Sequence, residues 1–231
     1  GGGKTYFLLT LIEALLHTNA VLYILDPKNA DLADLGTVMG NVYHTKKEMI
    51  DCVNAFYEGM VRRSEEMKRH PNYKTGENYA YLGLPPCFLI FDEYVAFFEM
   101  LGTKESVGLL SQLKKIVMLG RQAGYFLIVA CQRPDAKYFS DGIRDNFNFR
   151  VGLGRISELG YGMLFGSDVK KQFFQKRIKG RGYCDVGTSV ISEFYTPLVP
   201  KGHDFLQTIC SLAQARKDGT ATCEAKGDGT D

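Results

Sequence analysis

The first residues of the chain, Gly1-Gly2-Gly3-Lys4-Thr5, have the types and the order that phosphate binding requires. They match the end of the pattern G-x-x-x-x-G-K-[ST], in which backbone N–H groups surround phosphate oxygens and the lysine reaches the β- and γ-phosphates. Glycine permits this approach because it has no Cβ, and the N-terminus of the following helix attracts an anion. Thr5 would offer its hydroxyl to Mg²⁺. The alternative is a glycine-rich segment before an ordinary helix, and this segment alone does not decide between the two.

An acidic pair, Asp92-Glu93, follows the apolar run Cys87-Phe88-Leu89-Ile90-Phe91. Such a run predicts a buried strand, whose carboxyl end would carry the two carboxylates. Asp92 would hold Mg²⁺ together with Thr5, and Glu93 would orient or activate the water that attacks the γ-phosphate. An apolar run before two acids can also be a strand that ends at solvent. With a phosphate loop upstream, nucleotide hydrolysis is the better interpretation.

A further strand, predicted over residues 125–130, ends in Cys131-Gln132-Arg133-Pro134. Gln132 would sense the γ-phosphate by hydrogen bonding, as glutamines orient water in other phosphate-loop enzymes. The alternative is a glutamine that caps local backbone groups.

The spacing of apolar residues indicates the elements that must position these side chains. Apolar residues recur at helical spacing in several segments, and near-continuous apolar runs predict buried parallel strands. We therefore predict an α/β fold with a mostly parallel sheet flanked by helices, plus a small C-terminal β-hairpin. The predicted helices are 6–17, 45–70, 106–119, 143–146 and 157–165, and the predicted strands are 21–25, 87–91, 125–130, 147–153, 182–186 and 190–195.

Length and composition suit one soluble α/β domain over residues 1–212, followed by a disordered tail over 213–231. The chain has 231 residues, 45% of them hydrophobic, and a net charge of +2, which does not by itself indicate a nucleic-acid partner. Six cysteines without a C-x-x-C pair and four histidines without H-E-x-x-H argue against a disulfide framework or a zinc site. We expect a reducing cytoplasm. The first glycine of the phosphate pattern is expected before residue 1, so we expect a fragment.

A run of basic residues between 170 and 181 contains no acid. Lys170, Lys171, Lys176 and Arg177 are its candidates for contact with the phosphate backbone of DNA. A basic face that only stays solvated is an equally good interpretation.

With these motifs in order, residues Gly1 to Val186 resemble the motor domain of the FtsK/SpoIIIE family of DNA translocases. Within that family, the chain is more similar to the coupling ATPases of Gram-positive conjugative elements. Besides the phosphate loop and the acidic pair, the resemblance rests on Leu25-Asp26-Pro27-Lys28, Met60-Val61-Arg62-Arg63, the segment 124–134 and Gly180-Arg181-Gly182. Gln-Arg-Pro after a strand is its most distinctive element.

The resemblance implies a RecA-like P-loop NTPase core, a homohexameric ring, ATP and Mg²⁺ at the subunit interfaces, and double- or single-stranded DNA in the pore. It also implies an arginine that reaches the neighbouring subunit's γ-phosphate. Arg150 aligns with that finger, and Arg144 and Arg181 are the next candidates. A strand arginine can instead neutralise a carboxylate at an interface.

The chain departs from the family where a serine-lysine-aspartate-serine-arginine stretch is usual, because it has Ser157-Glu158-Leu159-Gly160-Tyr161-Gly162. It also has no counterpart of the winged-helix module of chromosome translocases. We expect a cytoplasmic motor at the inner face of the bacterial membrane, attached through upstream segments, with conjugation or relaxosome proteins as partners. Two alternatives stay open: an ATPase that moves proteins, as in type VII secretion, and an assembly module that binds nucleotide without turnover. Glu93 argues against the second.

Overall fold

The computed structural model describes residues 2–134, 137–139, 141–166, 169, 171–174, 178–188 and 190–224. Its centre is a parallel sheet with the strand order β2-β1-β3-β4. The strands are β1 (Val21–Leu25), β2 (Val42–Tyr43), β3 (Cys87–Phe91) and β4 (Tyr125–Val129). Leu25 is in register with Phe91, and Phe91 with Val129, so the carboxyl ends of three strands lie side by side. The prediction of a mostly parallel α/β sheet is confirmed.

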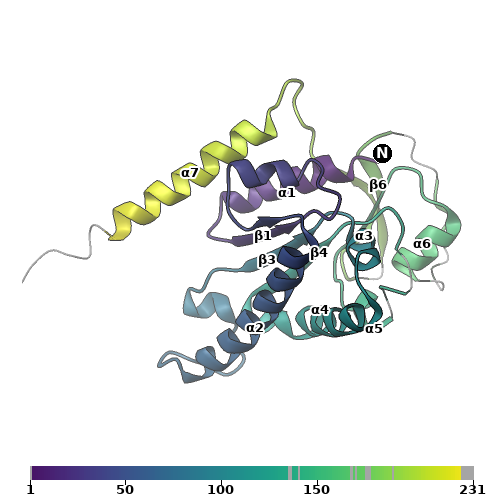
Figure 1. Ribbon diagram of the computed structural model, residues 1–231. Coiled ribbons are helices and arrows are strands. Elements are labelled where there is room, and N and C mark those ends of the chain that lie inside the picture. Colours follow the sequence, from purple (N-terminus) through teal and green to yellow (C-terminus); the bar gives the residue numbers. More distant parts are fainter. Residues whose placement is uncertain are drawn as a thin grey trace, which may run out of the picture.

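Helices cover both faces of this sheet (Figure 1). They are α1 (Lys4–Leu16), α2 (Lys46–Arg69), α3 (Tyr94–Glu99), α4 (Thr103–Ala123) and α7 (Phe205–Glu224). α2, α3 and α4 share one core with the sheet, in which Phe56, Phe97 and Ile116 are buried. α1 packs on the opposite face through the fully buried Ile12. Thr45 caps α2 by accepting a hydrogen bond from the backbone N–H of Glu48.

Three short helical segments connect the larger elements. They are the 3₁₀ turns η1 (Ala33–Thr37) and η2 (Tyr79–Leu82), and the helix α5 (Asp141–Arg144). η2 lies between α2 and β3, and α5 begins two residues before the helix predicted over 143–146.

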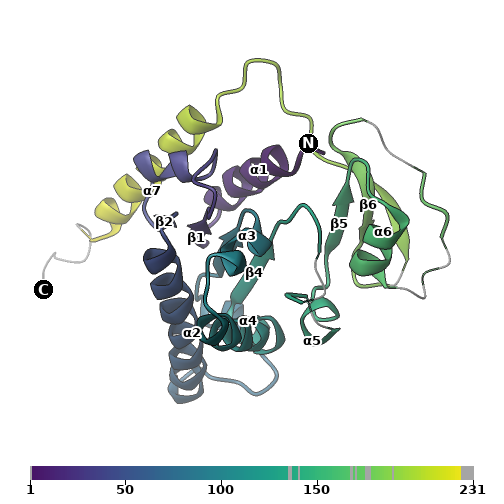
Figure 2. The ribbon, with the colours of Figure 1, turned by 45° about the vertical axis from the view of Figure 1, so that its right-hand side comes forward.

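A second, antiparallel sheet follows, with the order β5-β6-β7. It consists of β5 (Arg150–Leu153), β6 (Arg181–Asp185) and β7 (Ile191–Tyr195), and α6 (Glu158–Phe165) packs against it. The antiparallel sheet and α6 share a small core of their own, whose buried residues are Tyr161, Phe165, Tyr183 and Ile191. Figure 2 shows this sheet standing beside the parallel one. The predicted hairpin is therefore present, and β5 extends it to three strands.

The prediction of disorder from residue 213 is wrong as far as residue 224, because α7 runs to Glu224. Composition suggested disorder, but Ala213 is buried, and Ile209 on the preceding turn is fully buried in the core that α1 forms with the sheet. Arg216 also donates a hydrogen bond to the carbonyl of Ala20. Tertiary packing of this kind outweighs weak intrinsic helix propensity. The rest of the predicted tail lies outside the described residues.

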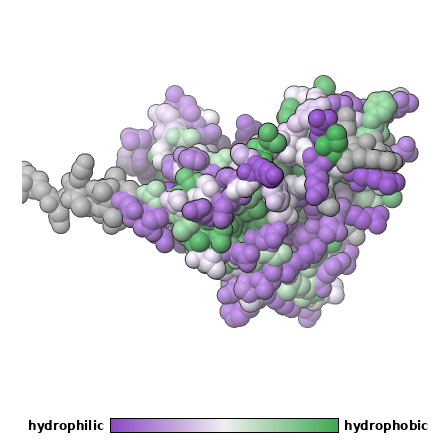
Figure 3. All heavy atoms as spheres, turned by 90° about the horizontal axis from the view of Figure 1, so that it is seen from above, coloured by the Kyte–Doolittle hydropathy of each residue, from purple (hydrophilic) through white to green (hydrophobic). Residues whose placement is uncertain are grey.

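The face of the molecule in Figure 3 mixes hydrophilic and hydrophobic side chains. Within the described part of the chain, no helix combines the length and the apolar character needed to cross a bilayer.

Candidate nucleotide-binding site

The phosphate-loop residues lie where α1 begins. Gly3 precedes the helix in a left-handed conformation, with φ 97° and ψ 14°, which glycine adopts without a steric penalty. Lys4 and Thr5 form the first turn, and both are partly buried. The free N–H groups of this turn suit an anion. Gly1, also predicted to bind phosphate, lies outside the described residues.

Turns at the ends of the antiparallel strands contact the backbone of this loop. The backbone N–H of Gly180 donates to the carbonyl of Gly2 at 3.0 Å. A Cβ on Gly2 would lie 2.6 Å from the carbonyl oxygen of Leu153, and a Cβ on Gly3 would lie 3.1 Å from the nitrogen of Gly180. The sequence indicated Gly180-Arg181-Gly182 only as part of a family resemblance. Its position shows why glycine is required on both sides of the contact.

Gly180→Ala is expected to weaken nucleotide binding. Gly180 has φ +77°, and a Cβ there would overlap the hydroxyl of Thr196. A left-handed alanine costs about 1–2 kcal/mol, and the strain would move the backbone that holds Gly2. Binding of ATPγS to the full-length protein should fall several-fold. Gly76→Ala is the matched control, because Gly76 has φ +93° with open space around its Cβ position. Equal ATPγS affinities in the two variants would contradict a supporting role for Gly180.

Glu93 lies at the carboxyl end of β3, between two ammonium groups. Its Oε1 is 2.6 Å from Nζ of Lys4, and its Oε2 is 3.5 Å from Nζ of Lys28. Burial alone would raise the pKa of this carboxyl, but the hydrogen bond and charge of Lys4, together with Lys28, lower it. Glu93 is therefore an ionised carboxylate, which can accept a proton from water.

Asp92 is buried beside a second acid, Asp26. Burial and the negative charge of Asp26 raise the pKa of Asp92 to about 6. Asp26 is itself fixed, because its carboxylate accepts hydrogen bonds from the backbone N–H groups of Lys28, Ala30 and Ala33. A divalent cation near Asp92 would offset this charge.

The donor set fits Mg²⁺, which takes few protein ligands and completes its shell with phosphate oxygens and water. Asp92 would supply a carboxylate and Thr5 a hydroxyl. No cluster of three His, Cys, Asp or Glu side chains able to hold a metal by itself occurs among the described residues.

The end of β4 joins the site through the backbone. The N–H of Tyr94, directly after Glu93, donates to the carbonyl of Ala130 at 2.8 Å. Burial raises the pKa of the Cys131 thiol to about 11. This thiol also interacts electrostatically with Lys4 and Glu93. Gln132 follows with an exposed side chain, which no described residue holds in a hydrogen bond. Its role as a γ-phosphate sensor stays a prediction.

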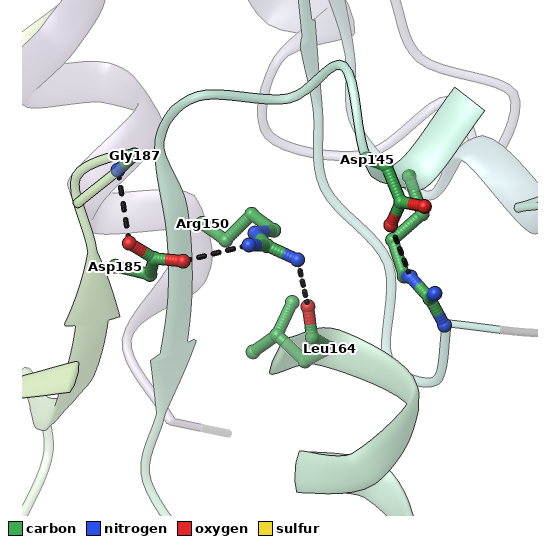
Figure 4. A network of polar contacts seen from close by, with 6 residues as sticks. Asp145, Arg150, Leu164, Asp185 and Gly187 are labelled. Atoms are coloured by element: carbon green, nitrogen blue, oxygen red, sulfur yellow. Dashed lines mark hydrogen bonds and ion pairs between the residues drawn. The ribbon is translucent and has the colours of Figure 1, made fainter. Parts of the chain in front are cut away.

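Arg150 lies on β5 and is engaged within its own chain (Figure 4). Its Nη2 is 2.6 Å from Oδ2 of Asp185, and its Nη1 donates to the carbonyl of Leu164 at 3.3 Å. The Arg150 side chain is 18% exposed and that of Asp185 is 4% exposed. Arg150 thus neutralises a buried carboxylate of its own chain, and its role as a finger stays a prediction. A finger role requires this ion pair to open.

The other candidate arginines have different surroundings. Arg144 pairs with the neighbouring Asp145, and Arg181, next to the phosphate loop, lies over the ring of Tyr195. Neither position decides which arginine reaches a neighbouring subunit.

In the predicted basic run, Lys171 donates a hydrogen bond to the carbonyl of Ile191 and lies over the ring of Tyr183. Its ammonium thus contacts β6 and β7 of the antiparallel sheet. Lys170, Lys176 and Arg177 lie outside the described residues. Contact between this run and DNA stays a prediction.

Comparison with known sequences identifies several relatives, although no family model matches the chain. The chain is 54% identical to the FtsK domain-containing protein YdcQ of Bacillus subtilis, over 100% of the chain and 48% of that protein. It is 24% identical to the DNA translocase FtsK of Helicobacter pylori, over 94% of the chain and 26% of that protein. It is 26% identical to the ESX secretion system protein YukB of Bacillus subtilis, over 84% of the chain and 14% of that protein. The chain thus spans about half of YdcQ and smaller parts of the others.

Solved structures share the fold. The pCW3 conjugation coupling protein TcpA, solved as a monomer with ATPγS, matches with a TM-score of 0.66 and 18% identity, over 87% of this chain and 59% of that one. ATPases 2 and 3 of Thermomonospora curvata EccC, in complex with a signal sequence peptide, match with a TM-score of 0.63 and 19% identity. The match covers 94% of this chain and 40% of that one. These likenesses confirm the P-loop ATPase fold.

Proposed function

The chain belongs to the FtsK/SpoIIIE family of ATPases, and from this we propose that it hydrolyses ATP to move DNA, in conjugative transfer. The observation that supports hydrolysis most directly is the contact between Lys4 and Glu93. The proposed phosphate-binding lysine and the proposed water-activating acid are 89 residues apart in the sequence, and their side chains lie 2.6 Å apart. This contact supports an ATPase site that uses both groups.

In the proposed reaction, the backbone of Gly1 to Gly3 and the ammonium of Lys4 bind the β- and γ-phosphates. Thr5 and Asp92 would hold Mg²⁺, which would supply positive charge beside the phosphates. Glu93 orients the attacking water and accepts its proton. Gln132 senses the γ-phosphate. An arginine from the neighbouring subunit of a homohexamer, Arg150 or one of its alternatives Arg144 and Arg181, would stabilise the charge of the transition state.

DNA is the proposed cargo because relatives and structural neighbours include a DNA translocase and a conjugation coupling protein. Conjugation or relaxosome proteins are then the expected partners, and the expected place is the cytoplasmic side of the membrane. A second cargo, protein, is supported by the likeness to YukB and to EccC with its signal sequence peptide. An assembly module without turnover is disfavoured, because Lys4 and Glu93 are both present and in contact.

The test is the ATPase rate of the full-length protein with and without double-stranded DNA, over a range of salt concentrations. We expect DNA to increase the rate, and the increase to shrink as salt rises, because contacts to DNA phosphates release counterions. Single-stranded DNA forms a parallel arm that identifies the preferred strand form. An ATPase that responds to no DNA at any salt concentration would contradict translocation of DNA. Stimulation by a signal-sequence peptide instead would favour protein transport.

A further inference from the structure

Glu93 has a second cation partner in Lys28, for which the sequence predicted no role. The two oxygens of the Glu93 carboxylate face different ammonium groups, Oε1 that of Lys4 and Oε2 that of Lys28. The Glu93 side chain is 12% exposed, whereas that of Lys28 is 44% exposed. Lys28 thus covers the solvent side of a carboxylate that the fold otherwise encloses.

The backbone around Lys28 is held rigidly at this position. The carboxylate of Asp26, which is fully buried, accepts hydrogen bonds from the N–H groups of Lys28 at 3.1 Å and of Ala30 at 2.7 Å. The turn begins where β1 ends, and β1 and β3 run in register up to Leu25 and Phe91. The turn after β1 and the acid after β3 follow strand ends that are in register, so Lys28 lies within reach of Glu93.

Nucleotide binding would affect the ion pairs of the two lysines with Glu93 differently. Lys4 is the ammonium of the phosphate loop, so the more highly charged phosphate oxygens compete with Glu93 for it. Glu93 would then lose its shorter ion pair at the moment when it has to orient water. Lys28 follows no phosphate-loop pattern and lies on the other oxygen of the carboxylate. It is the cation that can stay with Glu93 when Lys4 turns to the phosphates.

We propose that Lys28 is a positioning residue for the hydrolysis reaction, which holds the carboxylate of Glu93 in its catalytic orientation while Lys4 binds the phosphates. This inference rests on the proposed ATPase function. Lys28 acts through Glu93, so its loss should slow the chemical step and leave nucleotide affinity in place.

The test compares Lys28→Met with Lys28→Arg in the full-length protein, with ATP turnover and ATPγS affinity measured separately. We expect Lys28→Met to lower kcat about tenfold to a hundredfold, as a misplaced catalytic group does. The ATPγS dissociation constant should change by less than about twofold, because an interaction specific to the chemical step is lost. Lys28→Arg keeps the charge and should recover most of kcat. The matched control is Lys46→Met, because Lys46 is 41% exposed and forms a 2.8 Å ion pair with Glu105 on the surface.

The possible results separate this inference from the proposed function. If the unmodified protein does not hydrolyse ATP, the proposed function fails first. If it does hydrolyse ATP and Lys28→Met matches Lys46→Met in kcat, only the role of Lys28 is overturned. A large loss of ATPγS affinity in Lys28→Met would overturn it as well, because Lys28 would then be a phosphate ligand. Failure of Lys28→Arg to recover turnover would equally exclude a role based on charge.

Discussion

Glu93→Gln is expected to abolish ATP turnover by the full-length protein while ATP binding persists. A glutamine amide keeps the size of the side chain but cannot accept a proton from water, and the loss of a general base typically costs about 10²–10⁴-fold in rate. The substitution also releases Lys4 from its 2.6 Å ion pair. ATPγS affinity should therefore stay unchanged or increase. The measurement is phosphate release under saturating ATP, alongside an ATPγS titration.

Glu105→Gln is the matched control for this variant. Glu105 also accepts a hydrogen bond from a lysine, and the hydrogen bonds from Lys46 and from the backbone of Gly102 lower the pKa of its carboxyl. It lies on the surface at the start of α4, so its loss should leave turnover unaffected. Turnover that persists in Glu93→Gln would show that the water is activated elsewhere. Loss of turnover in both variants would show that removal of a carboxylate is harmful in general.

The parallel sheet and the main groups of the site could be predicted because their signals are local. Parallel strands buried on both faces are continuous apolar runs, so β1 and β3 have the predicted bounds and β4 ends one residue early. The carboxyl ends of such strands meet at one edge of the sheet. This rule is sufficient to predict from the sequence alone that Asp92 and Glu93 lie near the phosphate loop.

Contacts that depend on side-chain direction could not be predicted in the same way. Lys28 follows a strand as the acidic pair does, yet only the turn fixed by Asp26 directs its ammonium to Glu93. Arg150 and Asp185 are 35 residues apart, and each alone looks like an ordinary strand residue. Their pairing follows from the antiparallel register of β5 and β6, in which they are direct partners. A sequence pattern does not contain that register.

Arg150→Met is expected to destabilise the fold. Asp185 would keep its hydrogen bond from the N–H of Gly187, but its charge would be left buried without a cation. Breaking a buried ion pair by removing one partner costs about 3–5 kcal/mol. Thermal and urea unfolding of the full-length protein measure this loss. Arg62→Met is the control, because its pair with Glu66 is exposed and such pairs contribute about 0–1 kcal/mol.

A double-mutant cycle decides between the structural and the finger role of Arg150. Suppose that the role of Arg150 is to neutralise Asp185. The double variant Arg150→Met/Asp185→Asn should then be destabilised by less than the sum of the two single variants. The reason is that Asp185→Asn removes the buried charge that Arg150→Met leaves unpaired. A finger that serves a neighbouring subunit predicts the opposite pattern. Stability would then be unchanged in Arg150→Met, the two substitutions would be additive, and only the ATPase rate of the assembled protein would fall. The 2.6 Å contact and the low exposure of both side chains favour the first result.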